Sequence, residues 1–252
     1  MLLWRAHGLG NDYLVLESGE KLAPALVRAL CDRHRGIGSD GVLEPVAAAE
    51  GAEYGLRIHN PDGSEAEKSG NGLRIYAHWL VQERAAPAEF SVWTLGGVVR
   101  CVVRGTNVDV NMGRARVWGP EVLAGNVCWR VDLGNPHAVC FAEPIDWRQQ
   151  GAAIEAAVSG RTNVQFVSVA GGAARALIWE RGAGETQASG SSACAVAAVC
   201  VTRGLLSSPV TVTMAGGDLI VAVGDTLVLS GPVAPVGRFS VDDDWLRAHA
   251  GP

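Results

Sequence analysis

The chain has 252 residues, of which 48% are hydrophobic and 19% are charged, and this composition is globular rather than disordered. Its net charge of −5 excludes the basic surface that nucleic acids and anionic membranes attract, so we expect a small molecule as the partner. We find no signal peptide and no apolar run near the roughly 18 residues of a membrane span, so a cytosolic protein is expected. The six cysteines lie in apolar surroundings without CxxC spacing, which predicts buried, reduced thiols.

The first elements are two strands and a helix. Alternating residues predict strands over residues 2–7 and 13–17, and Pro24 is well placed to open a helix that continues until Gly36. The run GIGSDGVL, residues 36–43, follows. It is either a loop that feeds a strand or a set of backbone N–H groups for a ligand.

The rest of the chain is organised around residues 54–80. A strand is predicted over residues 54–60, and after a polar loop the residues Leu73, Tyr76, Ala77 and Leu80 recur at helical spacing in a helix that ends near Arg84. The helix starts at the run from Ser69 to Gly72, where glycines permit close approach to the backbone and first-turn N–H groups are unpaired. This start of the helix suits an anion.

The remaining elements repeat the same order. An antiparallel meander is predicted over residues 90–94, 98–103 and 107–112, and residues 113–120 are interpreted as the crossing into the second half. Further strands are expected near residues 127–133, 138–141, 164–169, 174–180, 210–214, 218–223 and 226–229, with a helix over 147–158. The helix after Ser192, ACAVAAVCV, is apolar on every side and should be wholly buried, and a short polar tail closes the chain.

The two halves are related by an internal repeat. Adding 120 to the residue number brings Ile58 onto Ile178, Glu65 onto Glu185, Ser69 onto Ser189 and Gly70 onto Gly190. Upstream, the run Leu-Gly-Asn at residues 9–11 resembles the run at 133–135. We therefore expect two domains, residues 1–114 and 115–252, with the last ~15 residues able to pack back on the first. A pseudo-twofold relation would point both Ser-Gly helix starts at one shared cleft.

Polar residues recur at the ends of the predicted elements. Their amide, guanidinium and N–H groups suit a ligand that carries both a carboxylate and an amine. These residues are Asn11, Asn60, Ser69, Asn71, Asn135, His137, Asn163, Glu180, Arg181 and Ser189.

The same residues carry a family resemblance. The runs HGLGNDYLVLE, DRHRGIGSDGVL, RIHNPDGSEAEKSGNGLRIYA, LGNPHAV, TNVQFV and ERGAGETQASGSSACA resemble successive motifs of the diaminopimelate epimerase family, in order and over nearly the whole chain. The resemblance implies an α+β fold of two pseudo-symmetric domains, each a barrel-like, mostly antiparallel sheet around a central helix. It also implies an isomerase that needs no cofactor and no metal, acts on an amino-acid α-carbon in lysine biosynthesis, and forms a homodimer.

Particular residues match the family's site positions. The resemblance implies substrate binding by Asn11, Asn60, Gly70, Asn71, Asn135, Asn163, Glu180, Arg181, Gly190 and Ser191, with catalytic assistance from His137 and Glu180.

The chain departs from the family at the two acid/base positions. The family has cysteines there, and this chain has Ser69 and Ser189. A thiol with a pKa near 8.5 can be held as a thiolate at a helix N-terminus, whereas a serine hydroxyl needs a strong neighbouring base. Cys194 should face the core and does not replace them. The substitutions fit an engineered inactive pair, natural divergence, or a loss of catalysis.

Several functions follow from this pattern. The first is a diaminopimelate-type epimerase, impaired by its serines, that converts the L,L isomer to the meso isomer by two-base proton transfer. The alternatives are a non-catalytic amino-acid binder and a one-base lyase or cyclase. A hydrolase built on Lys68 and Ser69 is remote, because adjacent side chains on a loop seldom converge.

Overall fold

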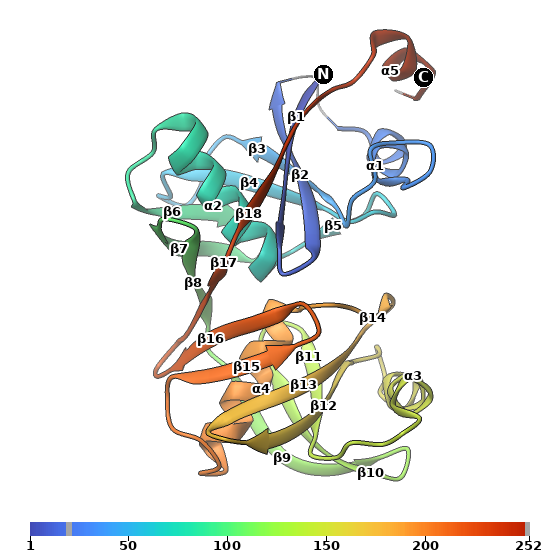
Figure 1. Ribbon diagram of the computed structural model, residues 1–252, viewed down its shortest axis with the longest axis vertical. Helices are drawn as coiled ribbons and strands as arrows, with labels where there is room; N and C mark the ends of the chain where they lie inside the picture. The colour runs from blue at the N-terminus through green and yellow to red at the C-terminus, as the bar shows by residue number, and fades with distance from the viewer. Residues whose placement is uncertain (19–21, 250–252) are drawn as a thin grey trace. The chain divides into compact units, whose positions relative to one another are not determined.

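The computed structural model describes residues 1–18 and 22–249 of the chain. The chain divides into two compact units. Unit 1 comprises Met1–Val110 and Pro232–Pro252, and unit 2 comprises Asn111–Gly231. Each unit is a curved sheet with helices, as the ribbon in Figure 1 shows.

Unit 1 has a mixed sheet in the order β18-β1-β2-β3-β4-β6-β7-β8, with β5 on β4. The pairs β2–β3 and β4–β6 are parallel and the others antiparallel. Its elements are β1 Leu2–Gly8, β2 Asn11–Ser18, α1 Pro24–Cys31, β3 Val42–Val46, β4 Tyr54–His59, β5 Glu65–Ala66, α2 Gly70–Arg84, β6 Glu89–Thr94, β7 Gly97–Arg104, β8 Asn107–Gly113, β18 Ala234–Ser240 and α5 Asp243–His249.

Unit 2 has the same topology, in the order β9-β10-β11-β12-β13-β15-β16-β17, with β14 on β13. Its parallel pairs, β11–β12 and β13–β15, stand at the equivalent places. Its elements are β9 Arg116–Leu123, β10 Asn126–Asp132, β11 Pro136–Cys140, α3 Trp147–Ala157, β12 Asn163–Ala170, β13 Ala173–Glu180, β14 Gly184–Glu185, α4 Gly190–Thr202, β15 Val210–Met214, β16 Gly217–Val223 and β17 Leu227–Pro232. The predicted fold of two similar units is confirmed.

A central helix fills the sheet of each unit. In unit 2, every residue of α4 from Ser192 to Cys200 is buried, as expected for a helix that is apolar all round. The helix contacts strands near both ends of its sheet, β9 and β16, so the sheet curves around it. In unit 1, α2 likewise contacts β1, β2 and β7, and its residues from Gly70 to Leu80 are buried. Burial of both helix starts fixes their position within each unit.

Two segments contain strands that the sequence did not predict, because the residues of these strands are largely exposed. Residues 113–120, expected as a crossing, contain most of β9, and the expected polar tail contains β18 and α5. Most residues of β9 and β18 are exposed or partly exposed, so neither strand has a period-2 apolar pattern. Strand β18 pairs with β1 and so returns the chain to unit 1.

Helix α1 is shorter than predicted. It ends at Cys31 rather than continuing to Gly36. The carboxylate of Asp32 accepts backbone N–H groups from His34 at 2.8 Å and Arg35 at 2.9 Å, and this turn competes with another helical turn.

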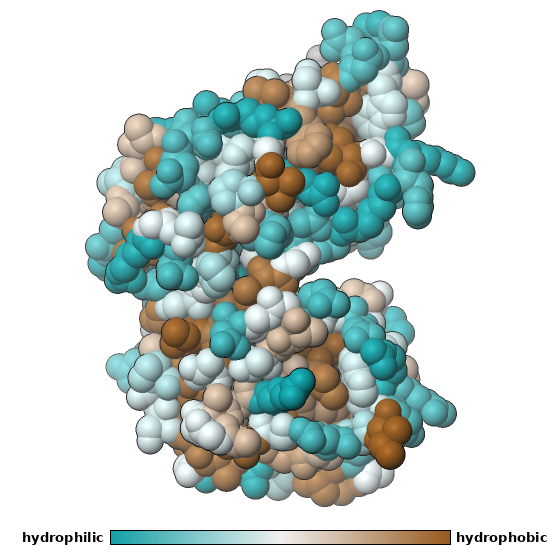
Figure 2. All heavy atoms as spheres, in the orientation of Figure 1, coloured by the Kyte–Doolittle hydropathy of each residue, from teal (hydrophilic) through white to brown (hydrophobic). Residues whose placement is uncertain are grey.

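Polar and apolar residues mix on the surface, and Figure 2 shows this on the visible face. The exposed Val122 and Val127 are register partners on β9 and β10. Among the described residues, no helix combines the length and the apolar character that a membrane span needs.

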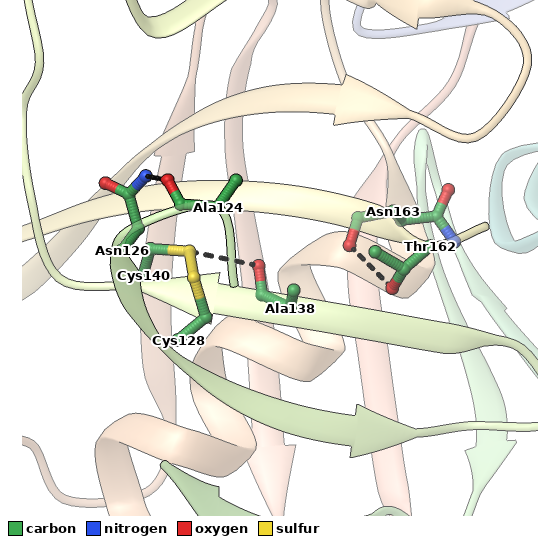
Figure 3. The surroundings of a disulfide bond; sticks show 7 residues. All are labelled: Ala124, Asn126, Cys128, Ala138, Cys140, Thr162 and Asn163. Carbon is green, nitrogen blue, oxygen red and sulfur yellow. Dashed lines mark hydrogen bonds between the residues drawn. A yellow bond between two sulfur atoms is a disulfide. The ribbon is translucent and has the colours of Figure 1, made fainter. Parts of the chain in front are cut away.

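The prediction that all cysteines are reduced is wrong. Cys128 and Cys140 form a disulfide, shown in Figure 3. The two residues face each other directly in the antiparallel register of β10 and β11, which sequence spacing does not reveal. Burial is confirmed for all six cysteines, and the other four, Cys31, Cys101, Cys194 and Cys200, form no disulfide.

The disulfide predicts a thiol count. Denatured protein that was purified without reductant should give four thiols with Ellman's reagent and six after reduction. Reduction should also lower the free energy of unfolding by about 3 kcal/mol, since the bridge closes a short loop. The double variant Cys128→Ser, Cys140→Ser should give four thiols in both conditions. A count of six before reduction would contradict the bridge.

Candidate active site

Helix α2 of unit 1 starts at a serine that caps it. Ser69 has extended backbone angles, φ −138° and ψ 119°, and its Oγ accepts the N–H of Gly72 at 3.0 Å. Serine is a favoured N-cap because its oxygen satisfies one of the orphan N–H groups of the first turn. The same Oγ lies 3.1 Å from the hydroxyl oxygen of Tyr13 on β2. The helix start predicted from the sequence is confirmed.

Helix α4 of unit 2 starts in the same way. Ser189 has φ −138° and ψ 121°, and its Oγ accepts the N–H of Ser192 at 3.4 Å. Ser189 and Gly190 are buried, and Ser191 is partly exposed. The sequence repeat is therefore also a repeat of backbone conformation.

Asn11 and Asn71 lie together in unit 1. The amide nitrogen of Asn71 donates to Asn11 Oδ1 at 2.9 Å, and the amide nitrogen of Asn11 donates to Asp40 Oδ2 at 2.8 Å. Arg74, fully buried in α2, donates to Asn71 Oδ1. Arg33 in turn donates to Asp40 Oδ1 at 2.6 Å. Hydrogen bonds thus fix both amides from two sides.

Asn60 forms a turn. Its side-chain nitrogen donates to Ser64 Oγ at 3.0 Å, and its backbone N–H donates to the Ser64 carbonyl at 2.8 Å. Asn60 directly follows β4, where its amide holds the tight loop that leads to β5.

Asn163 links three segments of unit 2. Its amide nitrogen donates to the Pro136 carbonyl at 3.0 Å, and its Oδ1 accepts the backbone N–H of Arg181 at 3.0 Å. The parallel register of β11 and β12 places His137 opposite Asn163. The structure therefore brings Asn163, His137 and the backbone of Arg181 together.

His137 is held between two amides. Its Nδ1 lies 3.1 Å from Gln165 Nε2, and its Nε2 lies 3.1 Å from Asn135 Oδ1. The amide of Gln165 donates, so the network assigns the imidazole proton to Nε2, which donates to Asn135. Gln165 Nε2 also donates to Ser192 Oγ in the first turn of α4, at 3.0 Å.

Burial keeps His137 neutral. The side chain has no exposed surface, and desolvation lowers its pKa to about 3. The positive charge of Arg181 contributes to the lowering. At neutral pH the ring is thus an uncharged link between Asn135 and Gln165.

Glu180 stands at the end of β13. Its Oε1 accepts the hydroxyl of Thr186 at 2.8 Å, and the carboxylate is partly buried. The following turn is held by Glu155 of α3, which accepts the N–H of Gly182 at 2.8 Å. Arg181 itself is exposed.

Sequence reasoning missed several residues of this surrounding. They are Tyr13, Asp40, Gln165 and Ser192, which hydrogen-bond to the predicted site residues Ser69, Asn11, His137 and Ser189 respectively. The internal repeat could have identified Tyr13. It follows Asn11 by two residues, as the candidate His137 follows Asn135.

The buried histidine predicts a pH-dependent stability. The unfolded chain takes up a proton at this histidine near pH 6.5, whereas the folded chain does so only at about 3, so stability falls as pH falls below 6.5. His137→Gln should remove about 2 kcal/mol of the loss between pH 7.5 and pH 5, measured by urea unfolding.

The exposed His34 supplies the control for this measurement. His34→Gln should keep the wild-type slope of stability against pH. Equal slopes for the wild type and His137→Gln would show that the ring takes up its proton at the same pH in the folded and the unfolded chain, which would contradict the prediction.

The sequence was compared with family profiles and with curated proteins, and both identify the same family. Residues 3–118 and 130–233 match the profile of diaminopimelate epimerase. Diaminopimelate epimerase 2 of a Nostoc species is 38% identical over 91% of this chain and 91% of its own length. The diaminopimelate epimerase of Magnetococcus marinus is 35% identical over 93% of this chain and 94% of its own.

Solved structures share the fold at low sequence identity. A hydroxyproline epimerase from Agrobacterium vitis, solved with trans-4-hydroxy-L-proline, has a TM-score of 0.75 at 16% identity and covers all of this chain and 98% of its own. A probable proline racemase from Agrobacterium radiobacter also has a TM-score of 0.75, at 17% identity, over 96% of this chain and 93% of its own. The sequence matches, which span both units, show that the chain belongs to the diaminopimelate epimerase family of isomerases.

Proposed function

We propose that this chain is a cofactor-independent amino-acid epimerase that interconverts L,L- and meso-diaminopimelate. The observation that carries the proposal is the repeated serine-capped helix start, at Ser69 in unit 1 and Ser189 in unit 2, within a chain of this family. The homodimer expected from the resemblance is part of the proposal.

The helix starts suit the α-carboxylate of an amino acid. The N–H groups of a first helical turn point away from the helix, and its partial positive charge attracts an anion. In the proposed mechanism these groups at Gly70, Asn71, Gly190 and Ser191 hold the carboxylate. They also stabilise the negative charge that develops when the α-proton leaves.

The proposed proton transfer uses one hydroxyl on each face of the α-carbon. Ser69 or Ser189 removes the α-proton, and the other serine returns a proton to the opposite face, so the configuration inverts. A hydroxyl is a much weaker acid than a thiol of pKa about 8.5, and turnover should therefore be slow unless a base assists.

Of the two candidates for the assisting base, His137 and Glu180, we assign the role to Glu180. Both ring nitrogens of His137 are engaged with Asn135 and Gln165, which supports a role in orienting the substrate-binding amide of Asn135. Glu180 accepts the hydroxyl of Thr186 through Oε1, and a carboxylate, unlike this neutral imidazole, can assist as an anionic base.

A non-catalytic amino-acid binder is the second candidate. One specific observation favours it, because each serine oxygen is already engaged as a helix cap. Serine at both positions keeps the anion site while it removes the acidic thiols. A one-base lyase or cyclase on the same fold would use only one of the two hydroxyls.

Exchange in D2O separates these functions. With L,L- and meso-diaminopimelate, an epimerase should incorporate deuterium at the α-carbon and interconvert the isomers, as measured by NMR and chiral chromatography. Exchange that leaves the configuration unchanged would indicate one-base chemistry. Binding measured by calorimetry without any exchange would establish the binder and contradict the epimerase.

Restoring thiols should increase the rate. The double variant Ser69→Cys, Ser189→Cys should epimerise diaminopimelate at least about 100-fold faster, since a properly poised acid and base contribute on the order of 10²–10⁴. Each single variant should fall between, because one face keeps its hydroxyl.

The exposed Ser207 gives a matched control. Ser207→Cys adds a thiol beyond the C-terminal end of α4, the end opposite Ser189, and should leave the rate unchanged. A double variant that folds and binds diaminopimelate yet stays inactive would refute the assignment of Ser69 and Ser189 as the acid/base pair.

A further inference from the structure

The ring of Tyr13 packs against a glycine whose lack of a side chain leaves space for it. The residue lies on β2 and keeps 7% of its surface exposed. A Cβ atom at Gly41 would lie 2.6 Å from the ring, so only glycine leaves the ring its space. The backbone N–H of Leu14 donates to the Gly41 carbonyl at 3.1 Å, which holds the strand against this glycine. The glycine-rich run at residues 36–43 therefore accommodates the tyrosine.

The hydroxyl of Tyr13 reaches the candidate acid/base group of unit 1. Its oxygen lies 3.1 Å from Ser69 Oγ, and either oxygen can donate. A serine hydroxyl has one O–H and two lone pairs, and the N–H of Gly72 takes one lone pair at 3.0 Å. The contact with Tyr13 takes either the O–H or the second lone pair. The group that this contact leaves unused, either the O–H or the second lone pair of Ser69, is available to a ligand.

We propose that Tyr13 is a positioning residue for Ser69, whose hydroxyl sets whether the serine presents a proton or a lone pair to the substrate. When Tyr13 donates, Ser69 directs its own O–H at the substrate and acts as the acid. When Tyr13 accepts, Ser69 presents a lone pair, which can accept a hydrogen bond from the substrate but can take the α-proton only if a neighbouring base removes the serine's own proton. The inference rests on the proposed function only where it gives Ser69 a role in proton transfer. The contact itself lies wholly within unit 1.

The equivalent residue of unit 2 has different hydrogen-bond partners. His137 stands where Tyr13 stands in unit 1, as the runs at residues 9–11 and 133–135 and the parallel pairs β2–β3 and β11–β12 indicate. Its ring bonds to Asn135 and Gln165, and within residues 1–18 and 22–249 it makes no hydrogen bond to Ser189. The two serines therefore have unlike partners, and loss of the Tyr13 hydroxyl should affect Ser69 alone.

A thiol reporter tests the contact without any substrate. Ser69→Cys places a thiol at a partly exposed site, while the four cysteines outside the disulfide are buried, so alkylation by iodoacetamide should report the new thiol first. The pH dependence of the alkylation rate gives its pKa. A tyrosine O–H that donates to the thiolate favours the charged form, so adding Tyr13→Phe should raise that pKa by about 1.

The control is a second tyrosine of unit 1. Tyr54 packs edge-on against Phe90, away from Ser69, and Tyr54→Phe should leave the pKa of the introduced thiol unchanged. Tyr13→Phe keeps the ring beside Gly41, and unfolding by heat verifies that both variants fold. An equal thiol pKa with tyrosine and with phenylalanine at position 13 would overturn the inference.

Turnover distinguishes failure of the inference from failure of the proposed function. With serine at position 69, Tyr13→Phe should lower kcat for diaminopimelate about 10-fold and leave KM nearly unchanged, because Ser69 is misdirected while the carboxylate site stays intact. If no variant turns over but the thiol pKa rises, the epimerase proposal fails and the positioning contact stands. If the wild type turns over and neither kcat nor the pKa responds to Tyr13→Phe, the inference is wrong.

Discussion

The structure depends on one hydrogen bond that occurs twice, from a backbone N–H of a first helical turn to the Oγ of the serine before it. It starts α2 at Ser69 and α4 at Ser189, each with nearly the same backbone angles. Such a cap contributes about 1 kcal/mol to stability. Because both helices are buried by the sheets around them, the caps have a fixed place in each unit. The first-turn N–H groups beside each cap are the groups suited to a carboxylate.

The capping role and the proposed catalytic role compete for the same atom. A serine oxygen that accepts an N–H at 3.0 Å is a good cap, but a serine hydroxyl is too weak an acid to lose its proton without a neighbouring base. The family resemblance implies thiols at these places, which are stronger acids and hence better suited to proton transfer. The serines thus cap the helices well but are poor acids and bases. The groups that contact each serine determine how readily it can transfer a proton.

Those neighbours differ between the units although the topology is the same. In unit 1 the cap contacts a phenol, and a chain of amides and charged groups from Arg74 to Asp40 holds Asn71 and Asn11. In unit 2 a neutral imidazole joins Asn135 to Gln165, and Gln165 reaches the first turn of α4. One fold, used twice, therefore gives its two helix starts different chemical surroundings.

The sequence by itself determined the repeat, the central helices, both helix starts and the family, because these follow from local periodicity, glycine spacing and capping residues. It singled out Asn11, His137 and Asn163 as candidate site residues through their places at the ends of predicted elements and through the family resemblance. Only the tertiary structure decided the rest. The exposed strands β9 and β18 are held by backbone pairing and leave no apolar pattern, and the bridge between Cys128 and Cys140 depends on strand register. Likewise the neutrality of His137 and the contact of Tyr13 with Ser69 arise from burial and packing between residues far apart in the chain.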